Sequence, residues 1–247
     1  MMNDPVEIHL LDRRVRLLQP AHGFRTSLDS VMLAAACPAR AGMRVLDMGS
    51  GVGGAAFCLL TRVPGIFLTG VELQKEYVAL ARENAVLNKK AATFVSGDIR
   101  SYEPEKRFDH VICNPPYLEA GAHTPSPMEE KALANGHLAS DLSLQDWLDA
   151  GFRALKSGGS LTLIHRADQT DRIVQGLGRR FGAVEIIPLW PRAGHAAKRI
   201  VVRAIKDRKS PTVLHPGLIL HEENGAYTPA ADTILRDGAA LYGTDRL

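Results

Sequence analysis

The sequence predicts a doubly wound α/β domain around a seven-stranded, mostly parallel sheet, with an antiparallel edge strand and a short N-terminal β-hairpin. Three observations lead to this prediction. Short apolar runs alternate with helical patterns through most of the chain, which is typical of parallel sheets covered on both faces. A glycine-rich turn follows the first run. The last two runs are joined by PRAGHAA at 191–197, which is too short for a helical crossover and therefore predicts antiparallel neighbours.

The first part of the chain is expected to precede the sheet. Residues 6–18 alternate weakly around Asp12 and Arg13, which predicts the hairpin. Residues 27–38 carry an apolar helical pattern that Pro38 ends.

The sheet strands and their helices follow in alternation. The predicted strands are short and apolar: 44–49, 67–72, 92–98, 108–114, 159–165, 183–190 and 198–206. The predicted helices are one that ends near residue 62 and those at 74–88, 144–156 and 168–180. Ligands of such sheets bind at the carboxyl ends of the strands, so the residues after each strand are the candidates for a site.

We expect one domain over residues 1–247, because the chain is long for one domain and short for two. Residues 1–40 form its N-terminal part, residues 41–206 the catalytic core and residues 207–247 a C-terminal extension.

The composition favours a globular cytoplasmic protein: 45% of the residues are hydrophobic and charges of both signs are mixed. The first residues do not have the pattern of a signal peptide, and no apolar run is long enough to span a bilayer. The three cysteines and nine histidines lack the spacing of a disulfide framework or a metal site, so we expect a reducing compartment and no metal.

Positive charge is concentrated in one segment. Residues 151–210 hold 13 lysines and arginines against 4 acidic residues, a net charge of +9, although the whole chain carries only +3. Its members include Arg166, Arg172, Arg179, Arg180, Arg192, Lys198 and Arg199. The segment is either a solvated face or a surface that binds phosphate.

The loop after the first core strand reads LDMGSGVGG, residues 46–54. The spacing of Gly49, Gly51 and Gly54 fits either a tight turn without a ligand or a backbone that approaches a nucleotide closely. Asp47, at the end of the strand, can bind a cationic group and would repel a pyrophosphate.

Acidic residues also follow the next two strands. The Glu72 carboxylate can accept both hydroxyls of a ribose, although a helix-capping role fits equally well. Asp98, or an amide beside it, can bind the edge of an adenine ring, although a helix N-cap is the alternative.

Together these residues resemble the class I S-adenosylmethionine (SAM) methyltransferases. The resemblance implies that Asp47 lies near the methionine amino group of SAM and that the glycine loop passes under the methionine and ribose. It implies that the later acids contact ribose and adenine. The cofactor-binding residues would be Asp47, Gly49, Ser50, Gly51, Gly53, Glu72, Leu73, Asp98, Ile99 and Asn114.

The fourth core strand ends in Asn114-Pro115-Pro116-Tyr117. Each proline fixes φ and holds the preceding residue extended, so the segment is stiff. The Asn114 side chain and the Pro115 carbonyl can accept the two hydrogens of a planar –NH₂ group, and Tyr117 offers a flat face for a ring. This arrangement suits methylation of an amine whose lone pair is delocalised. Such a nitrogen is a poor nucleophile, and hydrogen bonds to both of its hydrogens orient the lone pair toward the methyl group.

NPPY resembles the motif of methyltransferases that modify exocyclic amino groups, with Asn114, Pro115, Pro116 and Tyr117 as catalytic residues. The stretches 23–36, 198–206 and 218–235 are similar to those of the tRNA adenine-N6 methyltransferases that act beside the anticodon of a valine tRNA. The resemblance implies tRNA as the partner, which the basic segment 151–210 would bind.

The same resemblance places Arg25 or Ser27 near the carboxylate of SAM, with Gln19 and Pro20 on the same side; Arg25 as a surface charge is the alternative. The polar loop 118–137 either folds over the base or is a mobile surface loop. Other acceptors for the same chemistry stay open: a protein glutamine amide, guanine N2 in rRNA, or a small molecule. A protein that binds RNA without transferring methyl groups is a further alternative.

Overall fold

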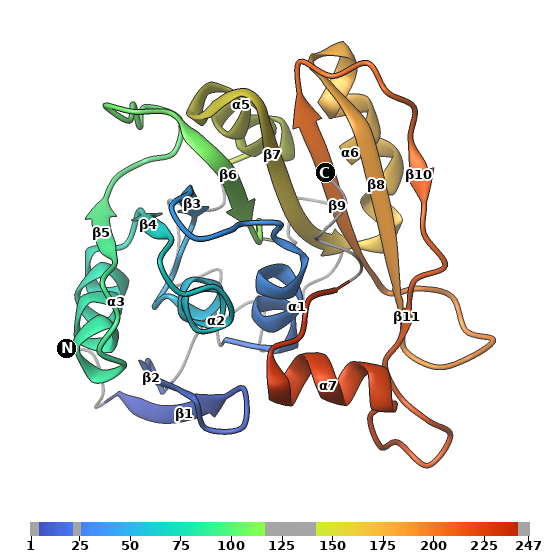
Figure 1. The fold of residues 1–247 in the computed structure, drawn as a ribbon, viewed down its shortest axis with the longest axis horizontal. Coiled ribbons are helices and arrows are strands. Elements are labelled where there is room, and N and C mark those ends of the chain that lie inside the picture. Colours follow the sequence, from blue (N-terminus) through green and yellow to red (C-terminus); the bar gives the residue numbers. More distant parts are fainter. Residues whose placement is uncertain (1–4, 22–25, 117–141, 242–247) are drawn as a thin grey trace.

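The computed structural model describes residues 5–21, 26–116 and 142–241, and its centre is one mixed sheet (Figure 1). The strand order is β10-β8-β9-β7-β6-β3-β4-β5, and β11 also pairs with β8. The seven predicted core strands are all present. They are β3 Arg44–Met48, β4 Phe67–Glu72, β5 Thr93–Ser96, β6 Phe108–Cys113, β7 Leu155–Arg166, β8 Phe181–Trp190 and β9 Arg199–Lys206.

The predicted fold class is confirmed, with one difference in strand position. β9 is antiparallel to both neighbours, as expected, but it lies between β7 and β8 and not at the edge. The short loop after β8 reverses the chain, so that one edge of β9 pairs with β8 and the other edge pairs with β7. Two short strands, β10 (Val213–Leu214) and β11 (Leu218–Ile219), then pair in parallel with the outer edge of β8.

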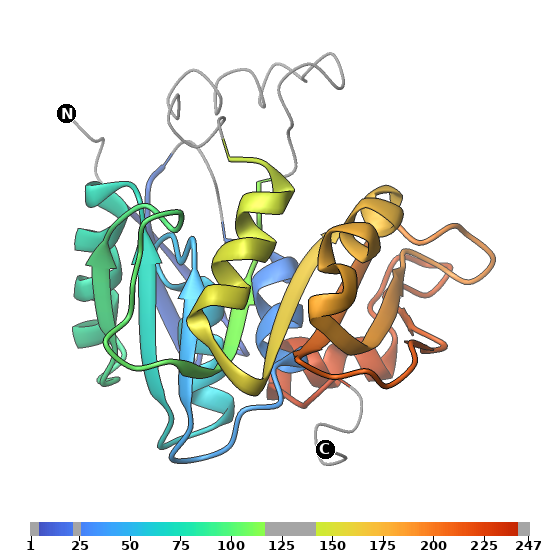
Figure 2. The ribbon, with the colours of Figure 1, turned by 90° about the horizontal axis from the view of Figure 1, so that it is seen from above.

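Helices cover both faces of the sheet (Figure 2). One face carries α1 (Leu28–Ala36), α2 (Gly54–Arg62) and α3 (Lys75–Leu87), and the other carries α5 (Leu144–Ala154) and α6 (Thr170–Leu177). The strands serve two apolar cores because successive side chains point to opposite faces. Val45 packs in the core beneath α1 and α2, and its neighbour Leu46 packs in the core beneath α5; both are fully buried.

The predicted hairpin is confirmed as β1 (Val6–Leu10) paired with β2 (Val15–Gln19). It is held against the core by Asn84 of α3, which is completely buried. Asn84 accepts a hydrogen bond from the Leu18 amide (2.7 Å) and donates to the carbonyls of Leu18 and Val52, each at 3.0 Å. A single side chain thereby links the hairpin, α3 and the glycine-rich loop.

The C-terminal extension continues the fold along one side of the molecule. After β11, α7 (Pro229–Asp237) begins at the N-cap Thr228 and packs against α1 (Figure 1). Its Ala231 and Ile234 are buried in the core that α1 covers, and the Leu241 amide donates to the Ala35 carbonyl at 2.9 Å. Within the described residues, no helix is long and apolar enough to cross a membrane.

Candidate active site

The site is built where the parallel strands β6, β3, β4 and β5 end, since neighbouring parallel strands bring their carboxyl ends to one edge of the sheet. The register pairs Met48 of β3 with Cys113 of β6, so Gly49 and Asn114, which follow them, leave the sheet side by side. The register also pairs Glu72 of β4 with Ser96 of β5, two residues before Asp98. The sheet therefore brings the predicted site segments after β3, β4, β5 and β6 to one rim.

The glycine-rich loop after β3 has a backbone that other residues rarely adopt. Gly49, Gly51 and Gly53 have φ angles of +66°, +53° and +93°. The Gly49 and Ser50 amides both donate to the Val71 carbonyl, at 2.8 and 3.1 Å, which turns the chain sharply at the strand end. The loop then enters α2 at Gly54. The glycines are required by the local conformation, as the sequence indicated.

Close packing also requires Gly49. A Cβ atom on Gly49 would lie 2.5 Å from Cη2 of Trp147, a buried residue of α5. The indole therefore packs against the first turn of the loop from the opposite face of the sheet. Sequence reasoning missed Trp147, because a tryptophan on the apolar face of an amphipathic helix has the pattern of an ordinary core residue.

Glu72 joins the glycine-rich loop to the end of β4. Its Oε2 accepts from the Gly51 amide and its Oε1 from the Gln74 amide, both at 2.9 Å. The side chain does not cap α3 in the expected way, since Gln74 is the N-cap residue and forms no side-chain cap bond. Burial raises the pKa of Glu72. The amides of Gln74, Gly51 and Leu73 oppose this shift. A carboxylate offers about four acceptor sites, so Glu72 can still accept from a ligand hydroxyl. Leu73, half-buried, lies beside it.

Asp47 is the most unusual carboxyl group of the rim. It is only 3% exposed, and its Oδ2 has no hydrogen-bond partner among the described residues. Burial first, and the Glu72 carboxylate second, raise the pKa of Asp47 to about 8, although the Ala56 amide opposes this shift. A buried carboxylate with an open acceptor is stabilised by a cationic donor, such as an ammonium group.

At Asp98 the helix N-cap alternative is wrong, and the contact with adenine stays a prediction. Asp98 caps a turn and not a helix: its Oδ1 accepts from the Arg100 amide at 2.8 Å, and its carboxylate pairs with the Arg100 guanidinium. The hydrogen bond from the Arg100 side chain lowers the pKa of Asp98. The neighbouring Ile99 is buried. The position after β5 is as expected, but Arg100 already engages this carboxylate.

Asn114 and Pro115 follow β6 directly. Pro115 is buried and Pro116 is exposed. Asn114 is partly buried, and its Oδ1 lies below the surface without a hydrogen-bond partner among the described residues. An amide oxygen in that state accepts a hydrogen bond from a ligand. Tyr117 and the loop 118–137 lie outside the described residues.

The segment before α1 reaches the same rim. Ser27 is the N-cap of α1 and accepts from the Asp29 amide at 3.3 Å, so a structural role already occupies its hydroxyl group. A Cβ atom on Gly54 would lie 2.5 Å from Cγ2 of Thr26, which shows that this segment packs directly on the start of α2. The Gln19 side chain accepts from the Thr26 amide at 3.0 Å. Arg25 lies outside the described residues.

The rim holds several buried polar atoms without partners. Among the described residues they are Oδ2 of Asp47, Oγ of Ser50, Oδ1 of Asn114 and Nε1 of Trp147. Buried polar groups in native proteins are almost always satisfied, so such a concentration indicates a polar ligand. The rim offers acidic acceptors for an ammonium group and for hydroxyls. No phosphate-binding cation lies at the glycine turn among the described residues. These features fit SAM. The fold and the rim together define a SAM-dependent methyltransferase.

Comparison with known proteins gives the family. The family model for the methyltransferase small domain matches residues 25–189, and the chain belongs to this family. Similar curated proteins include two named tRNA1(Val) (adenine(37)-N6)-methyltransferase. The one from Shewanella baltica (strain OS185) is 30% identical over 228 residues, which cover 89% of this chain and 94% of the relative. The one from Aeromonas hydrophila is 29% identical over 209 residues, 83% and 86% of the two chains.

Solved structures show the same fold. A predicted O-methyltransferase from Agrobacterium tumefaciens superposes with a TM-score of 0.71 at 28% identity, over 87% of this chain and 98% of the other. A 16S rRNA N2 methyltransferase from T. thermophilus superposes with a TM-score of 0.57 at 20% identity, over 82% of this chain and 50% of the other. The similarity to this second structure shows a shared fold and no more.

Proposed function

We propose that this methyltransferase transfers the methyl group of SAM to N6 of an adenine in tRNA. The observation that carries the proposal is the buried, unpartnered Oδ1 of Asn114 beside the glycine-rich loop. It is an acceptor held by a stiff Asn-Pro-Pro segment at the place where the cofactor loop begins. An exocyclic –NH₂ group is the donor that suits it.

The chemistry at this rim is an in-line displacement. Bound SAM would supply the activated methyl group: the amine nitrogen would bond to the methyl carbon, the carbon–sulfur bond would break, and the sulfur would keep the electron pair as a neutral thioether. Asn114 Oδ1 and the Pro115 carbonyl accept the two amino hydrogens and turn the nitrogen lone pair toward the methyl group. The gain is one of orientation and electrostatics in the transition state. The proton leaves the alkylated nitrogen afterwards, so no strong base is required.

We assign the remaining rim residues to the cofactor. Asp47 would accept from the methionine ammonium, and Glu72 would accept from the ribose hydroxyls. The backbone of Gly49, Ser50, Gly51 and Gly53 would support the methionine and ribose. Leu73 and Ile99 would flank the adenine, and Asp98 or an amide beside it would bind the adenine edge, with Arg100 as a competitor for the carboxylate. The Ser27 segment would close this side.

Two observations favour an RNA acceptor. The curated relatives act, by their names, on adenine 37 of a valine tRNA, and they match nearly the full length of this chain. The segment 151–210 carries a net charge of +9, which suits a polyphosphate partner. An adenine in a single-stranded loop is already partly unstacked, so its extrusion into a pocket costs little. A cytoplasmic location is consistent with this substrate.

The proposal is tested with tritiated SAM and three acceptor pools from a strain that lacks the protein: total tRNA, ribosomal RNA and soluble protein. Incorporation into tRNA, recovered as N6-methyladenosine after nucleoside analysis, is the expected result. Label in ribosomal RNA alone would indicate guanine N2 as the acceptor, and label in protein alone would indicate a glutamine amide. Binding of SAM without label in any pool would contradict the proposed acceptor.

A further inference from the structure

The basic segment does not form one surface, because the strands and helices within it run between the two ends of the sheet. β7 and β8 end at the carboxyl rim where Asn114 lies, and the antiparallel β9 begins there. α6 starts at this rim, and residues 178–180 lead from its end to the start of β8 at the opposite rim (Figure 2). Cations of the same segment therefore lie at opposite ends of the molecule.

One group of cations lies at the carboxyl rim. Arg166, the last residue of β7, pairs in register with Arg199, the first residue of β9. Lys198 precedes Arg199, and Arg192 follows the end of β8; both are exposed. Arg166 and Arg199 form ion pairs with Asp168 and Asp29, which hold their guanidinium groups in place.

A second group lies at the amino end of these strands. Arg179 and Arg180 follow α6, and Lys206 pairs in register with Phe181 at the start of β8. Arg208 and Lys209 pass directly beside Gly182. The Arg180 guanidinium turns back along α6, where it pairs with Asp149 and donates to the Gly176 carbonyl at 3.2 Å, so it belongs to neither group. The other cations of this group are separated from Asn114 by the length of the sheet.

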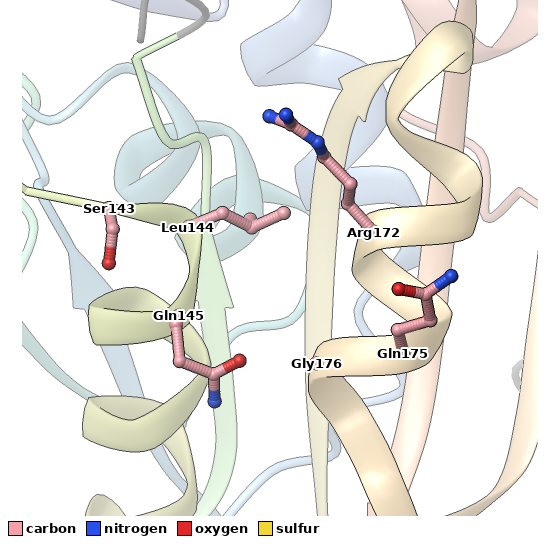
Figure 3. A pocket seen from close by; sticks show the side chains of 6 residues that line it. All are labelled: Ser143, Leu144, Gln145, Arg172, Gln175 and Gly176. Carbon is pink, nitrogen blue, oxygen red and sulfur yellow. The ribbon is translucent and has the colours of Figure 1, made fainter.

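A polar groove adjoins the first group. It lies between the N-terminus of α5 and the first turns of α6, with a cavity volume of about 390 Å³. Its described lining residues are Ser143, Leu144, Gln145, Arg172, Gln175 and Gly176. Figure 3 shows Leu144 and Gln145 on α5 facing Gln175 and Arg172 across the gap.

The groove combines one cation with amide side chains. Among its described lining residues, Arg172 carries the only charge. The helices pack closely at Gly176, where an added Cβ would lie 2.5 Å from Leu148 and 2.9 Å from the Gln145 amide oxygen. A guanidinium group binds phosphate, and the amides of Gln145 and Gln175 can donate to or accept from a base edge.

We propose that the carboxyl-rim cations and the α5–α6 groove bind the RNA strand that flanks the target adenine, and that the cations at the opposite end take no part. The proposal rests on the proposed function and deepens it. Phosphates would lie along Arg166, Arg199, Lys198 and Arg192, and one flanking nucleotide would enter the groove with its phosphate at Arg172. The carboxyl-rim cations and the groove lie at the same end of the sheet as Asn114. The amino-end cations lie at the other end.

The test compares two charge-matched triple variants. Arg172→Gln/Arg192→Gln/Lys198→Gln removes three exposed cations from the carboxyl rim. Arg179→Gln/Arg208→Gln/Lys209→Gln removes three exposed cations from the opposite end. Affinity for an unmodified valine tRNA transcript is measured over a range of salt concentrations, and calorimetric SAM binding verifies that both variants are folded.

We expect the rim variant to weaken tRNA binding on the order of tenfold or more and to reduce the slope of log K against log salt by about two, since each phosphate contact contributes about 0.7–0.9. The opposite-end variant should keep the wild-type slope. Equal effects of the two variants, or a larger effect of the opposite-end variant, would show that the carboxyl rim is not the RNA-binding surface. Methylation of tRNA by the wild-type protein would leave the proposed function intact in that case. A wild-type protein that binds SAM but neither binds nor methylates tRNA would instead remove the proposed function, and this inference with it.

Discussion

At the scale of single residues, the folded chain buries polar atoms without a partner at the rim of the sheet. Leaving a buried acceptor unsatisfied costs about 1–3 kcal/mol, so two such atoms at one rim point to a bound partner there. Asn114 Oδ1 and Asp47 Oδ2 are two such atoms at one rim. Their roles differ: Asp47 is expected to act in binding the cofactor, and Asn114 in orienting the acceptor.

The raised pKa of Asp47 predicts how stability depends on pH. The pKa is about 8 in the folded protein against 3.8 for a free carboxyl, so the folded state holds the proton more tightly. This stabilisation is fully present below about pH 4 and is lost as the pH rises through 8. We therefore expect the Tm of the ligand-free wild type to fall between pH 5 and 8 relative to that of Asp47→Asn, by several degrees, because 1 kcal/mol shifts Tm by about 2–4 °C in a chain of this size.

Thermal unfolding at a series of pH values measures this difference. Glu83→Gln, an exposed change on α3, serves as the control and should follow the wild-type curve. Saturating SAM should narrow the gap between wild type and Asp47→Asn at pH 8, since an ammonium group would then compensate the carboxylate. Parallel curves for wild type and Asp47→Asn would show that the burial of Asp47 has no such consequence.

At the scale of elements, the contact between the glycine-rich loop and α5 joins the cofactor side of the site to the helix on the opposite face. Gly49→Ala would introduce a methyl group 2.5 Å from the Trp147 ring at a φ of +66°. Overpacking costs about 1–3 kcal/mol and the left-handed backbone about 1–2 kcal/mol. We expect both a lower Tm and SAM affinity reduced on the order of tenfold, which corresponds to about 1.4 kcal/mol.

Gly42→Ala separates the two contributions. Gly42 also has a positive φ, +84°, but an added Cβ would meet nothing within 4 Å. Its substitution should cost only the backbone strain and leave SAM binding unchanged. Trp147→Leu should restore part of the loss in the Gly49→Ala background, as a double-mutant cycle would show. Equal losses in Gly42→Ala and Gly49→Ala would argue against a steric role for Trp147.

At the scale of the whole molecule, the C-terminal extension shares its core with the catalytic part. Ile234 of α7 is 5% exposed and packs in the cluster that contains α1. Glu185 of β8 accepts from Arg203 of β9 at 2.7 Å and contacts His215 of the extension at 2.8 Å. The extension is therefore expected to unfold together with the core.

Ile234→Ala tests this expectation. Deleting the buried side chain should cost about 2–5 kcal/mol and lower the Tm of a single cooperative transition. Val213→Ala, an exposed change in the same extension, should stay within about 0.5 kcal/mol of wild type. Two separate transitions by calorimetry in Ile234→Ala would show that the extension folds on its own.

The strength of the sequence patterns explains how much of this fold was predictable. The seven core strands and the helices between them have strong periodicity, and their existence was predicted with small errors at the ends. β7 begins at Leu155, earlier than expected, because Gly158 and Gly159 have the pattern of a turn. β9 has an inner position that strand sequence alone does not specify. β10 and β11 are too short to carry a detectable period.

The site was predictable where chemistry is linked to a strand end. Asp47 and Glu72 lie at the ends of buried strands, and the glycines and Asn114 follow such strands. The parallel sheet brings all of them to one rim. Trp147 was not predictable, because its contact with Gly49 depends on how α5 packs on the opposite face. The engagement of Asp98 by Arg100 was also missed, since a salt bridge two residues away has no distinguishing pattern. The roles of these residues in SAM binding stay predictions.

Asn114 is proposed to orient the acceptor amine without holding the cofactor, and a comparison of three variants of this residue distinguishes the two roles. SAM affinity and the single-turnover rate on tRNA are measured for wild type, Asn114→Ala and Asn114→Asp, the last of which keeps an acceptor oxygen. We expect all three to bind SAM within about threefold of one another, a difference below 1 kcal/mol. Asn114→Ala should lose about 10²–10³ in rate, and Asn114→Asp should retain more than the alanine variant. A near wild-type rate for Asn114→Ala, or a loss confined to SAM affinity, would contradict the account.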